Sequence, residues 1–529
     1  MARLPALRLR HVWFVLPLAL TALAFGLLPL RSWDYWWHIT AGRWSSWSGE
    51  ILTQNMFLYT LPTEHASLSQ PWLSQSILYH LFEWCGLTGS LLFRNILVCA
   101  IVLNVMLVMR KEKVSPVQTS LTLLAALPLM VATMTLRTHL FVWPLFVFLL
   151  VLMRWLRRSQ ADQWWLLLTL PVTLLWAQLH GSFLMPCVLL FMWGVARLTD
   201  VKKRWKTSPK PSSLISLGVL AVVCAMLAAA LHPAGFVGVY AYLYDVSSDP
   251  VVRQTVTEWM PTVPSRQPLV APLLYLWLIV GAWFFIQRRR VVDRFDLVVF
   301  FGFGALAVFQ TRGVLWFALA APLTLTPYLP GAIEDIVDES EVPAALQVIH
   351  AMLIVMLGLM AVLPQPGLKT HAVLASLTSA TPVRRSQPWR GLVTEDTPLE
   401  AMAWLVEHPE HRRLFHDQRW AGLILWSLME RDKPTQMVFV DQRIELPKEQ
   451  IWGLHDSISM ARSAWRLQLE AHDVTAILVD PTTQAPLFKT LEQDTTWTRV
   501  THDDHHSLFV LLPKEEDEDD GDDRVVEAE

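Results

Sequence analysis

Long apolar runs separated by short polar segments dominate the chain. A helix needs roughly 20 apolar residues to cross the hydrocarbon core of a bilayer, and fewer where neighbouring helices cover it. About eleven runs fit this description, namely residues 12–30, 91–109, 117–136, 140–153, 164–178, 183–195, 214–231, 268–286, 297–309, 314–329 and 344–363. The pattern predicts a mainly α-helical protein, a polytopic transmembrane bundle of about eleven helices.

Basic residues mark one side of the predicted bundle. Three arginines precede the first run, and later basic clusters lie at 110–113, 154–158, 202–206 and 288–290. If the runs are counted in order, these clusters share one side, which the positive-inside rule assigns to the cytoplasm. The inside loop 331–343 is acidic, but acidic residues weigh little in this rule. We therefore expect a multi-pass protein of the inner (plasma) membrane with a cytoplasmic N-terminus.

The organisation of the chain changes after the last run. Residues 1–364 form the predicted transmembrane domain, which includes a large first outer loop, 31–90. Residues 365–397 are rich in Ser, Thr, Pro and Ala and predict a linker. Residues 398–513 alternate helical and strand patterns, which predicts a soluble α/β domain outside the cytoplasm. Residues 514–529 carry ten acidic residues against two basic ones, so we expect a disordered tail.

Local patterns predict individual elements in the two soluble parts. In the first outer loop, residues 71–84 have apolar positions at helical spacing, which indicates either a helix on the membrane surface or an extension of the second span. In the C-terminal domain we expect helices over 399–407, 422–429 and 458–471, and strands over 437–440, 476–479 and 507–512.

Composition supports the membrane class and excludes others. Apolar residues make up 53% of the chain and charged residues 17%, whereas soluble domains are about a quarter charged. The net charge of −3 gives no reason to expect a nucleic-acid partner, and membrane lipids are the expected surroundings. The sequence has no P-loop, dinucleotide fingerprint or zinc-helix motif. The histidines of 502–506 are more consistent with a solvated turn than with a metal site.

Asp34 is the main candidate for chemistry. It follows the first span by four residues, at the outer interface and among aromatic residues. Partial desolvation raises the pKa of a carboxyl group and makes it a better base, so a catalytic role is one interpretation. The alternative is that Asp34 pairs with Arg31 or caps a helix.

The stretch that begins at Asp34, D-Y-W-W-H-I-T-A-G, resembles the start of a family of bacterial polytopic proteins similar to the GT-C superfamily of lipid-linked-sugar glycosyltransferases. Further similar stretches occur in the same order along nearly the whole chain, at 55–60 (N-M-F-L-Y-T), 176–183 (W-A-Q-L-H-G-S-F), 232–235 (H-P-A-G), 258–261 (E-W-M-P), 419–422 (R-W-A-G) and 440–443 (V-D-Q-R). Each motif alone is weak, and the ordered series is what makes the resemblance specific.

The resemblance implies a GT-C-like fold and an activity. Such enzymes move a sugar from a polyprenyl-phosphate donor to an acceptor on the outer side of the membrane, with inversion at the anomeric carbon. It implies Asp34 as catalytic acid or base, with Glu258 as second acid. The leaving phosphate needs cations or donors, and the substrate-binding candidates are Trp36, Trp37, His38, Arg137, His139, His180 and Arg312. No cofactor is assigned, although a divalent metal stays open.

Two other functions compete with this interpretation. Asn55 and Gln75 stand where the family has acids, so the chain could be a non-catalytic scaffold or accessory subunit that binds a protein partner through its C-terminal domain. A transporter is disfavoured, because the sequence shows no internal repeats with paired broken helices.

Overall fold

The computed structural model describes residues 7–159, 162–201, 211–248, 256–330, 343–362, 365, 389, 391–431, 433, 435–446 and 449–512. The acidic tail, the basic cluster 202–206, the acidic loop 331–342 and most of the linker lie outside these residues.

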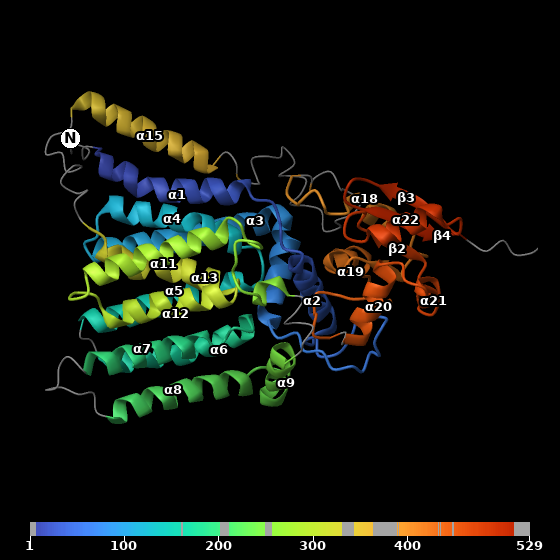
Figure 1. Cartoon of the computed structure of the whole chain (residues 1–529), viewed down its shortest axis with the longest axis horizontal. Coiled ribbons are helices and arrows are strands. Elements are labelled where there is room, and N and C mark those ends of the chain that lie inside the picture. The colour runs from blue at the N-terminus through green and yellow to red at the C-terminus, as the bar shows by residue number, and fades with distance from the viewer. Residues whose placement is uncertain are drawn as a thin grey trace, which may run out of the picture.

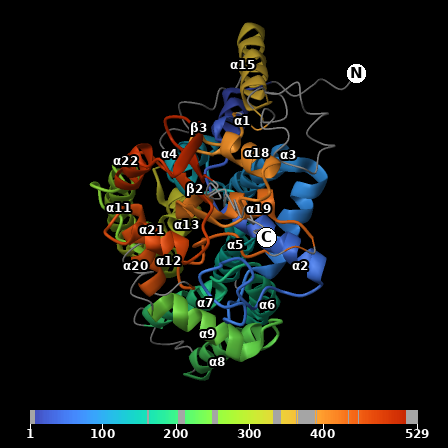
Figure 2. The same ribbon diagram turned by 90° about the vertical axis from the view of Figure 1, so that its right-hand side faces the viewer.

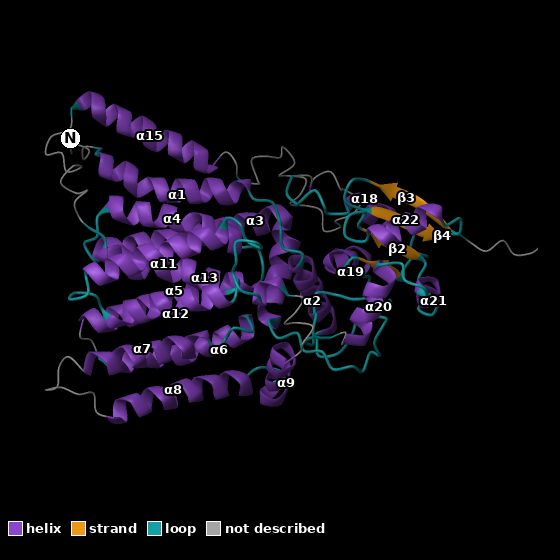
Figure 3. Ribbon diagram, viewed as in Figure 1, coloured by secondary structure: helices purple, strands orange, loops and turns teal. Residues whose placement is uncertain are grey.

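A bundle of roughly aligned helices makes up the larger part of the molecule, and each predicted span coincides with one of them (Figure 1, Figure 3). The bundle consists of α1 (Leu9–Leu27), the second half of α3 (Trp72–Lys111), α4 (Pro116–Thr133), η1 (Thr138–Phe141) with α5 (Trp143–Ser159), η2 (Gln163–Leu168) with α6 (Thr169–Leu179), α7 (Met185–Val201), α8 (Pro211–Ala230), α11 (Val270–Gln287), α12 (Arg294–Phe309), α13 (Gly313–Leu325) with η4 (Thr326–Tyr328), and α15 (Ala344–Val362). Within the described ranges, six helices are long and apolar enough to cross a membrane, or seven if a bent pair counts as one span. The number of crossings therefore stays a prediction.

A sharp bend in α3 resolves the two interpretations of residues 71–84. Gly86 adopts φ 64° and ψ −169° inside the helix, a conformation that glycine reaches without steric cost. The part before the bend is continuous with the second span but lies across the end of the bundle, beside α2 (Asp34–Ser48) (Figure 1). Gly42 permits this approach, because a Cβ atom there would lie 2.3 Å from the backbone oxygen of Gln75.

A second helix at the same end, α9 (Gly235–Ser248), was missed by the sequence analysis. It turns by 102° from α8 and crosses the end of the bundle (Figure 1). The helix begins at Gly235, where φ is +66°. Together, α2, the first half of α3 and α9 form a layer between the bundle and the C-terminal residues.

The C-terminal residues form a small mixed sheet with helices around it (Figure 2). Their elements are α18 (Leu399–Glu407), β1 (Leu414–His416), η7 (Gln418–Trp420), α19 (Ala421–Leu428), α20 (Glu449–Ser459), α21 (Trp465–Glu470), β2 (Ala476–Val479), α22 (Ala485–Gln493), β3 (Trp497–His502) and β4 (Ser507–Leu511). The strand order is β1-β2-β4-β3, with β1 parallel to β2 and the other pairs antiparallel. The domain boundaries themselves stay a prediction.

Some predicted elements of this region were wrong. Residues 437–440 are not a strand, because Val438 makes only isolated bridges to Leu58 and Leu414. Of the predicted helix 458–471, only the last two residues of α20 and the whole of α21 are helical. Most of α20, the strands β1 and β3 and the helix α22 were not predicted. The strand β1 has only three residues, and most residues of β3 are polar or exposed, so neither has an apolar pattern long enough to recognise.

These elements, α18 to β4, form the C-terminal unit, which packs directly on α2. The Oγ1 atom of Thr40 donates to the backbone oxygen of Gly422 at 3.4 Å, and Arg43 donates to the backbone oxygen of Trp426 at 2.7 Å. Trp420, Leu425 and Trp426 are all buried, as expected for residues at this contact. The contact places the unit over the end of the bundle where α2 begins.

Gly422 permits the close approach of α19 to α2, and this gives a first test. A Cβ atom at position 422 would lie 2.4 Å from the backbone nitrogen of Trp37, so any side chain must push the two helices apart. We expect Gly422→Val to expose the contact to proteolysis severalfold faster than in the wild type. Gly453→Val is the matched control, because a Cβ atom at Gly453 meets nothing within 4 Å. Equal cleavage rates for the two variants would contradict this contact.

Ion pairs join alternate helix ends at the far end of the bundle. Arg154 on α5 lies 3.0 Å from Glu112, which follows α3, and Arg157 lies 2.7 Å from Asp293, which precedes α12. Helix ends that the sequence analysis assigned to the cytoplasm therefore meet one another, and the C-terminal unit lies at the opposite end (Figure 1).

Orientation in the membrane can be tested with a reporter. A periplasm-dependent reporter enzyme fused after Pro513 should be active, because the positive-inside rule predicts that the end of the bundle with the basic loops lies in the cytoplasm. The same reporter fused after Arg290 should be inactive. The reverse pattern would invert the topology.

Candidate functional site

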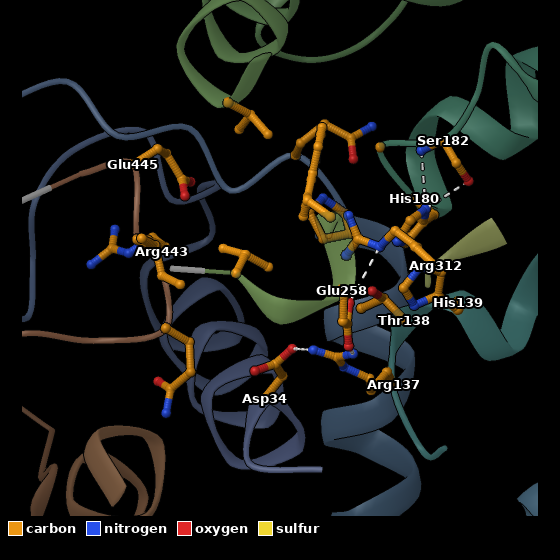
Figure 4. A pocket seen from close by; sticks show the side chains of 18 of the residues that line it. Asp34, Arg137, Thr138, His139, His180, Ser182, Glu258, Arg312, Arg443 and Glu445 are labelled. Atoms are coloured by element: carbon orange, nitrogen blue, oxygen red, sulfur yellow. Dashed lines mark hydrogen bonds and ion pairs between the residues drawn. The ribbon is translucent and has the colours of Figure 1, made fainter. Parts of the chain in front are cut away.

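Four charged residues meet where the bundle faces the C-terminal unit. Asp34 is the first residue of α2, and Arg137 lies between α4 and η1 with an extended backbone. Glu258 belongs to the short helix η3 (Thr257–Trp259), and Arg312 immediately precedes α13. Each therefore comes from a different helix end, and the bundle brings them together although they are far apart in sequence (Figure 4).

Arg137 bridges the two acids. One of its terminal nitrogens donates to Asp34 and the other donates to Glu258. Glu258 also faces Arg312, whose Nε atom lies 3.4 Å from Glu258 Oε2, and the backbone nitrogen of Arg312 donates to the backbone oxygen of Glu258 at 2.9 Å. The result is an alternating chain of two carboxylates and two guanidinium groups.

This pairing overturns the expected pKa of Asp34. Burial alone would raise the pKa of its carboxyl group, but the charge and hydrogen bond of Arg137, together with the charge of Arg312, outweigh burial and hold the pKa below its usual range. The pKa of Glu258 is lowered in the same way, against burial, by Arg137 and Arg312. Asp34 is therefore ionised and paired, and its side chain keeps 30% of its surface exposed.

Histidines line the site beside these charges. The rings of His139 and His180 lie 3.8 Å apart between centroids. His180 Nδ1 is 2.8 Å from the hydroxyl of Ser182, and burial together with nearby cations holds the pKa of His180 well below 6.5. Burial likewise lowers the pKa of His38 to about 4, although Asp34 opposes this shift. Both imidazoles are therefore neutral near pH 7, and each can donate or accept a hydrogen bond.

A cavity of about 640 Å³ opens beside the four charged residues Asp34, Arg137, Glu258 and Arg312. Its wall includes the sequence-predicted residues Asp34, Trp37, His38, Arg137, His139, His180, Glu258 and Arg312. Trp36 is the exception, because its ring is buried and packs 4.9 Å from that of Trp389. Adjacent residues on a helix point about 100° apart, so Trp37 faces the cavity while Trp36 faces the core.

The sequence did not predict the part of the cavity wall that α9 and the C-terminal unit contribute. Tyr242 on α9 and Arg443 and Glu445 from the C-terminal unit also line the cavity (Figure 4). Arg443 is held by Asp441 and lies 5.4 Å from the ring of Trp37. The only signal in the sequence was the V-D-Q-R stretch of the family resemblance, which suggested no contact with the first outer loop.

The positions that depart from the family pattern have structural roles. Asn55 is fully buried and donates to the backbone oxygens of Leu58 and Leu61, which shapes the first outer loop. Gln75 contacts His38 at 3.2 Å and so orients a cavity residue. His232 contacts the backbone oxygen of Gln70 at 3.0 Å.

The donor set does not fit a divalent metal between Asp34 and Glu258. Arg137 already occupies the space between the two carboxylates and uses one oxygen of each. Throughout the described ranges, no group of three or more His, Cys, Asp or Glu residues is arranged to hold a metal ion. We therefore assign no chemical step to a metal.

Comparison with known proteins finds similarity in structure but not in sequence. No family model matches the chain, and no curated protein matches it. The apo crystal structure of the Archaeoglobus fulgidus oligosaccharyltransferase is similar, with a TM-score of 0.53, 12% identity, and coverage of 90% of this chain and 71% of the archaeal one. The same enzyme tethered to an acceptor peptide with the NVT sequon gives a TM-score of 0.50 at 11% identity, covering 88% and 69%.

The oligosaccharyltransferase belongs to the GT-C superfamily. The chain has a GT-C-like fold. This confirms the fold that the sequence resemblance implied. The six apolar helices of spanning length within the described residues support a multi-pass membrane protein. At 12% identity the likeness concerns the fold alone, so the chemistry has to be argued from the residues of the site.

Proposed function

We propose that the chain is a membrane glycosyltransferase of the GT-C type. It moves a sugar from a polyprenyl-phosphate donor to an acceptor on the outer side of a bacterial inner membrane, with inversion. The observation that carries this proposal is the convergence of Asp34, Arg137, Glu258 and Arg312 on one cavity at a single end of the bundle. The charges suit a reaction in which a phosphate departs and a hydroxyl attacks.

The two arginines suit the leaving group. As the bond between the anomeric carbon and the phosphate oxygen breaks, the electron pair stays on the lipid phosphate, whose charge needs cationic donors. Arg137 and Arg312 present guanidinium groups to the cavity, and the imidazole of His139 adds hydrogen-bonding capacity. These groups are fixed in place before the substrate arrives, which is where electrostatic stabilisation is most effective.

Asp34 becomes a better base when the donor is bound. In the free protein, Arg137 holds the pKa of Asp34 low. A phosphate placed against Arg137 offsets that cationic charge, so the pKa of Asp34 rises towards its usual range. The acceptor hydroxyl oxygen then attacks the anomeric carbon from the side opposite the phosphate, and its proton passes to Asp34.

A non-catalytic scaffold is the second candidate. The observation in its favour is that both acids of the site are already neutralised by arginine in the free protein. In that case the cavity and the C-terminal unit hold a protein partner rather than a sugar.

A transfer assay separates the two candidates. The full-length chain is reconstituted in proteoliposomes with a panel of radiolabelled polyprenyl-phosphate sugars and with envelope extracts as acceptors. Acceptor labelling with inverted anomeric configuration is the expected result. Labelling with retained configuration contradicts the mechanism, and no labelling with any donor favours the scaffold.

A further inference from the structure

A second cavity of about 320 Å³ is also lined by Asp34, Arg137, Glu258 and Arg312. Its wall combines the segment that follows α1, the end of α4, η3, and the starts of α5 and α13. No described residue of the C-terminal unit lines it, in contrast to the larger cavity. The smaller cavity is therefore built by the bundle end alone.

Its wall carries an excess of positive charge. Arg31, Arg137 and Arg312 line it, against the two acids Asp34 and Glu258. The two acids are engaged with Arg137 and Arg312. Among the residues that the structure describes, Arg31 has no carboxylate partner, so its charge is available for an anion.

Two further donors in the wall lack partners within the described part of the chain. The Oγ atom of Ser32 and the indole Nε1 atom of Trp143 are buried without a hydrogen bond. Leaving such a group unpaired in the interior is unfavourable, and an anionic oxygen is a partner that both could use. In the larger cavity, by contrast, the two arginines from the C-terminal unit are already held by aspartates, Arg419 by Asp417 and Arg443 by Asp441.

The position of Arg31 suits a ligand that reaches the site from the membrane. It follows α1 closely, and Leu27 at the end of α1 has 55% of its surface exposed. A cation at the end of an apolar span lies at the depth of lipid phosphates. A polyprenyl chain lying along α1 would bring its phosphate to this cavity.

The two cavities share one wall. Asp34, Arg137, His139, Glu258 and Arg312 line both of them. A transferase needs two substrates beside its reacting groups, and here one cavity is small and cationic while the other is larger and lined in part by the C-terminal unit.

We propose that the smaller cavity binds the phosphate of the lipid-linked donor, with Arg31 as its recognition residue, and that the larger cavity receives the acceptor. This inference rests on the proposed function and assigns its two substrates to separate places. The shared chemistry is a phosphate oxyanion, whether it belongs to a lipid or is free in solution.

Binding can be measured without any transfer reaction. The full-length protein in nanodiscs is titrated with undecaprenyl phosphate and, separately, with inorganic phosphate, and the dissociation constants are read by native mass spectrometry. We expect Arg31→Gln to weaken binding of undecaprenyl phosphate about tenfold, the value of one charge-assisted contact. Arg31→Lys should restore part of the affinity, because it keeps the charge but loses the planar guanidinium group, which can donate two hydrogen bonds to one phosphate.

The matched control is Arg266→Gln, which changes an exposed arginine of an outer loop that lines neither cavity. Its affinity should equal that of the wild type. Equal affinities for Arg31→Gln and Arg266→Gln overturn the proposal, and so does a wild-type protein that binds neither probe. If the protein binds inorganic phosphate but shows no preference for undecaprenyl phosphate, the claim that the cavity recognises a lipid-linked phosphate is overturned.

The failure of this inference differs from the failure of the proposed function. If the wild type binds undecaprenyl phosphate through Arg31 but transfers no sugar, the phosphate site stands and the enzyme assignment falls. If the wild type transfers sugar and Arg31→Gln leaves KM for the donor unchanged, the enzyme assignment stands and the phosphate site falls.

Discussion

Replacing Asp34 with asparagine should lower sugar transfer by about a hundredfold to ten-thousandfold, the usual contribution of a positioned general base. The substitution keeps the size of the side chain and its ability to accept a hydrogen bond from Arg137, but removes the group that receives the proton. The rate is measured in proteoliposomes at saturating donor. KM for the donor should change much less than kcat, because Arg137 and Arg312 remain in place.

Two measurements keep this prediction separate from a folding defect. The thermal unfolding midpoint of Asp34→Asn should stay close to that of the wild type, because Arg137 keeps its contact with Glu258. Glu50→Gln is the control for removing an acid nearby, since Glu50 is exposed shortly after α2 and lines neither cavity. Full activity in Asp34→Asn would end the catalytic interpretation, and equal losses in the two variants would indicate a general charge effect.

Much of the bundle could be predicted because it depends on local pattern. A continuous run of about 20 apolar residues in a membrane is expected to be helical, because a helix satisfies its backbone hydrogen bonds within the run itself. The apolar runs therefore located the helices, and the positive charges indicated which helix ends lie on the same side of the bundle. The bend at Gly86 and the helix α9 were harder to see, because each depends on one glycine in a single unusual backbone conformation.

The position of the candidate site was also predictable, since the residues at one set of helix ends must meet. The electrostatics of the site were not. Asp34 and Arg137 are 103 positions apart, so nothing local indicates that they pair. The sequence suggested a desolvated base, whereas in the structure the pKa of Asp34 is lowered by a cation that only the tertiary fold brings close.

In the C-terminal unit, the sequence predicted several elements but not the contact that they make with the bundle. Its helices α18 and α19 and its strand β2 follow from apolar runs, but its contact with α2 depends on shape. Gly422 fits against Trp37 because the glycine has no side chain to separate the two backbones. Complementarity of this kind has no periodic signature, so the contribution of Arg443 and Glu445 to the cavity wall could not be read from the sequence.

The largest effect on stability is expected at the opposite end of the bundle. Arg154 is almost fully buried and is paired with Asp296 on α12 and with Glu112 after α3. Asp296 is equally buried and also accepts a hydrogen bond from Tyr328 at 2.7 Å. Removing one partner of a buried ion pair leaves the other charge uncompensated, which costs about 3–5 kcal/mol.

Arg154→Met keeps the volume of the side chain and removes its charge. We expect the free energy of unfolding, measured by titration with SDS in mixed micelles, to fall by about 3 kcal/mol, the lower end of the range for a broken buried pair. The lower end applies because Arg158 lies 3.1 Å from Asp296 and compensates in part. Arg110→Met is the control, since Arg110 is exposed at the same end of the bundle, and it should change the free energy of unfolding by less than about 0.5 kcal/mol. If both variants unfold like the wild type, the ion pairs contribute nothing to stability, and the helix ends they join must be held by apolar packing alone.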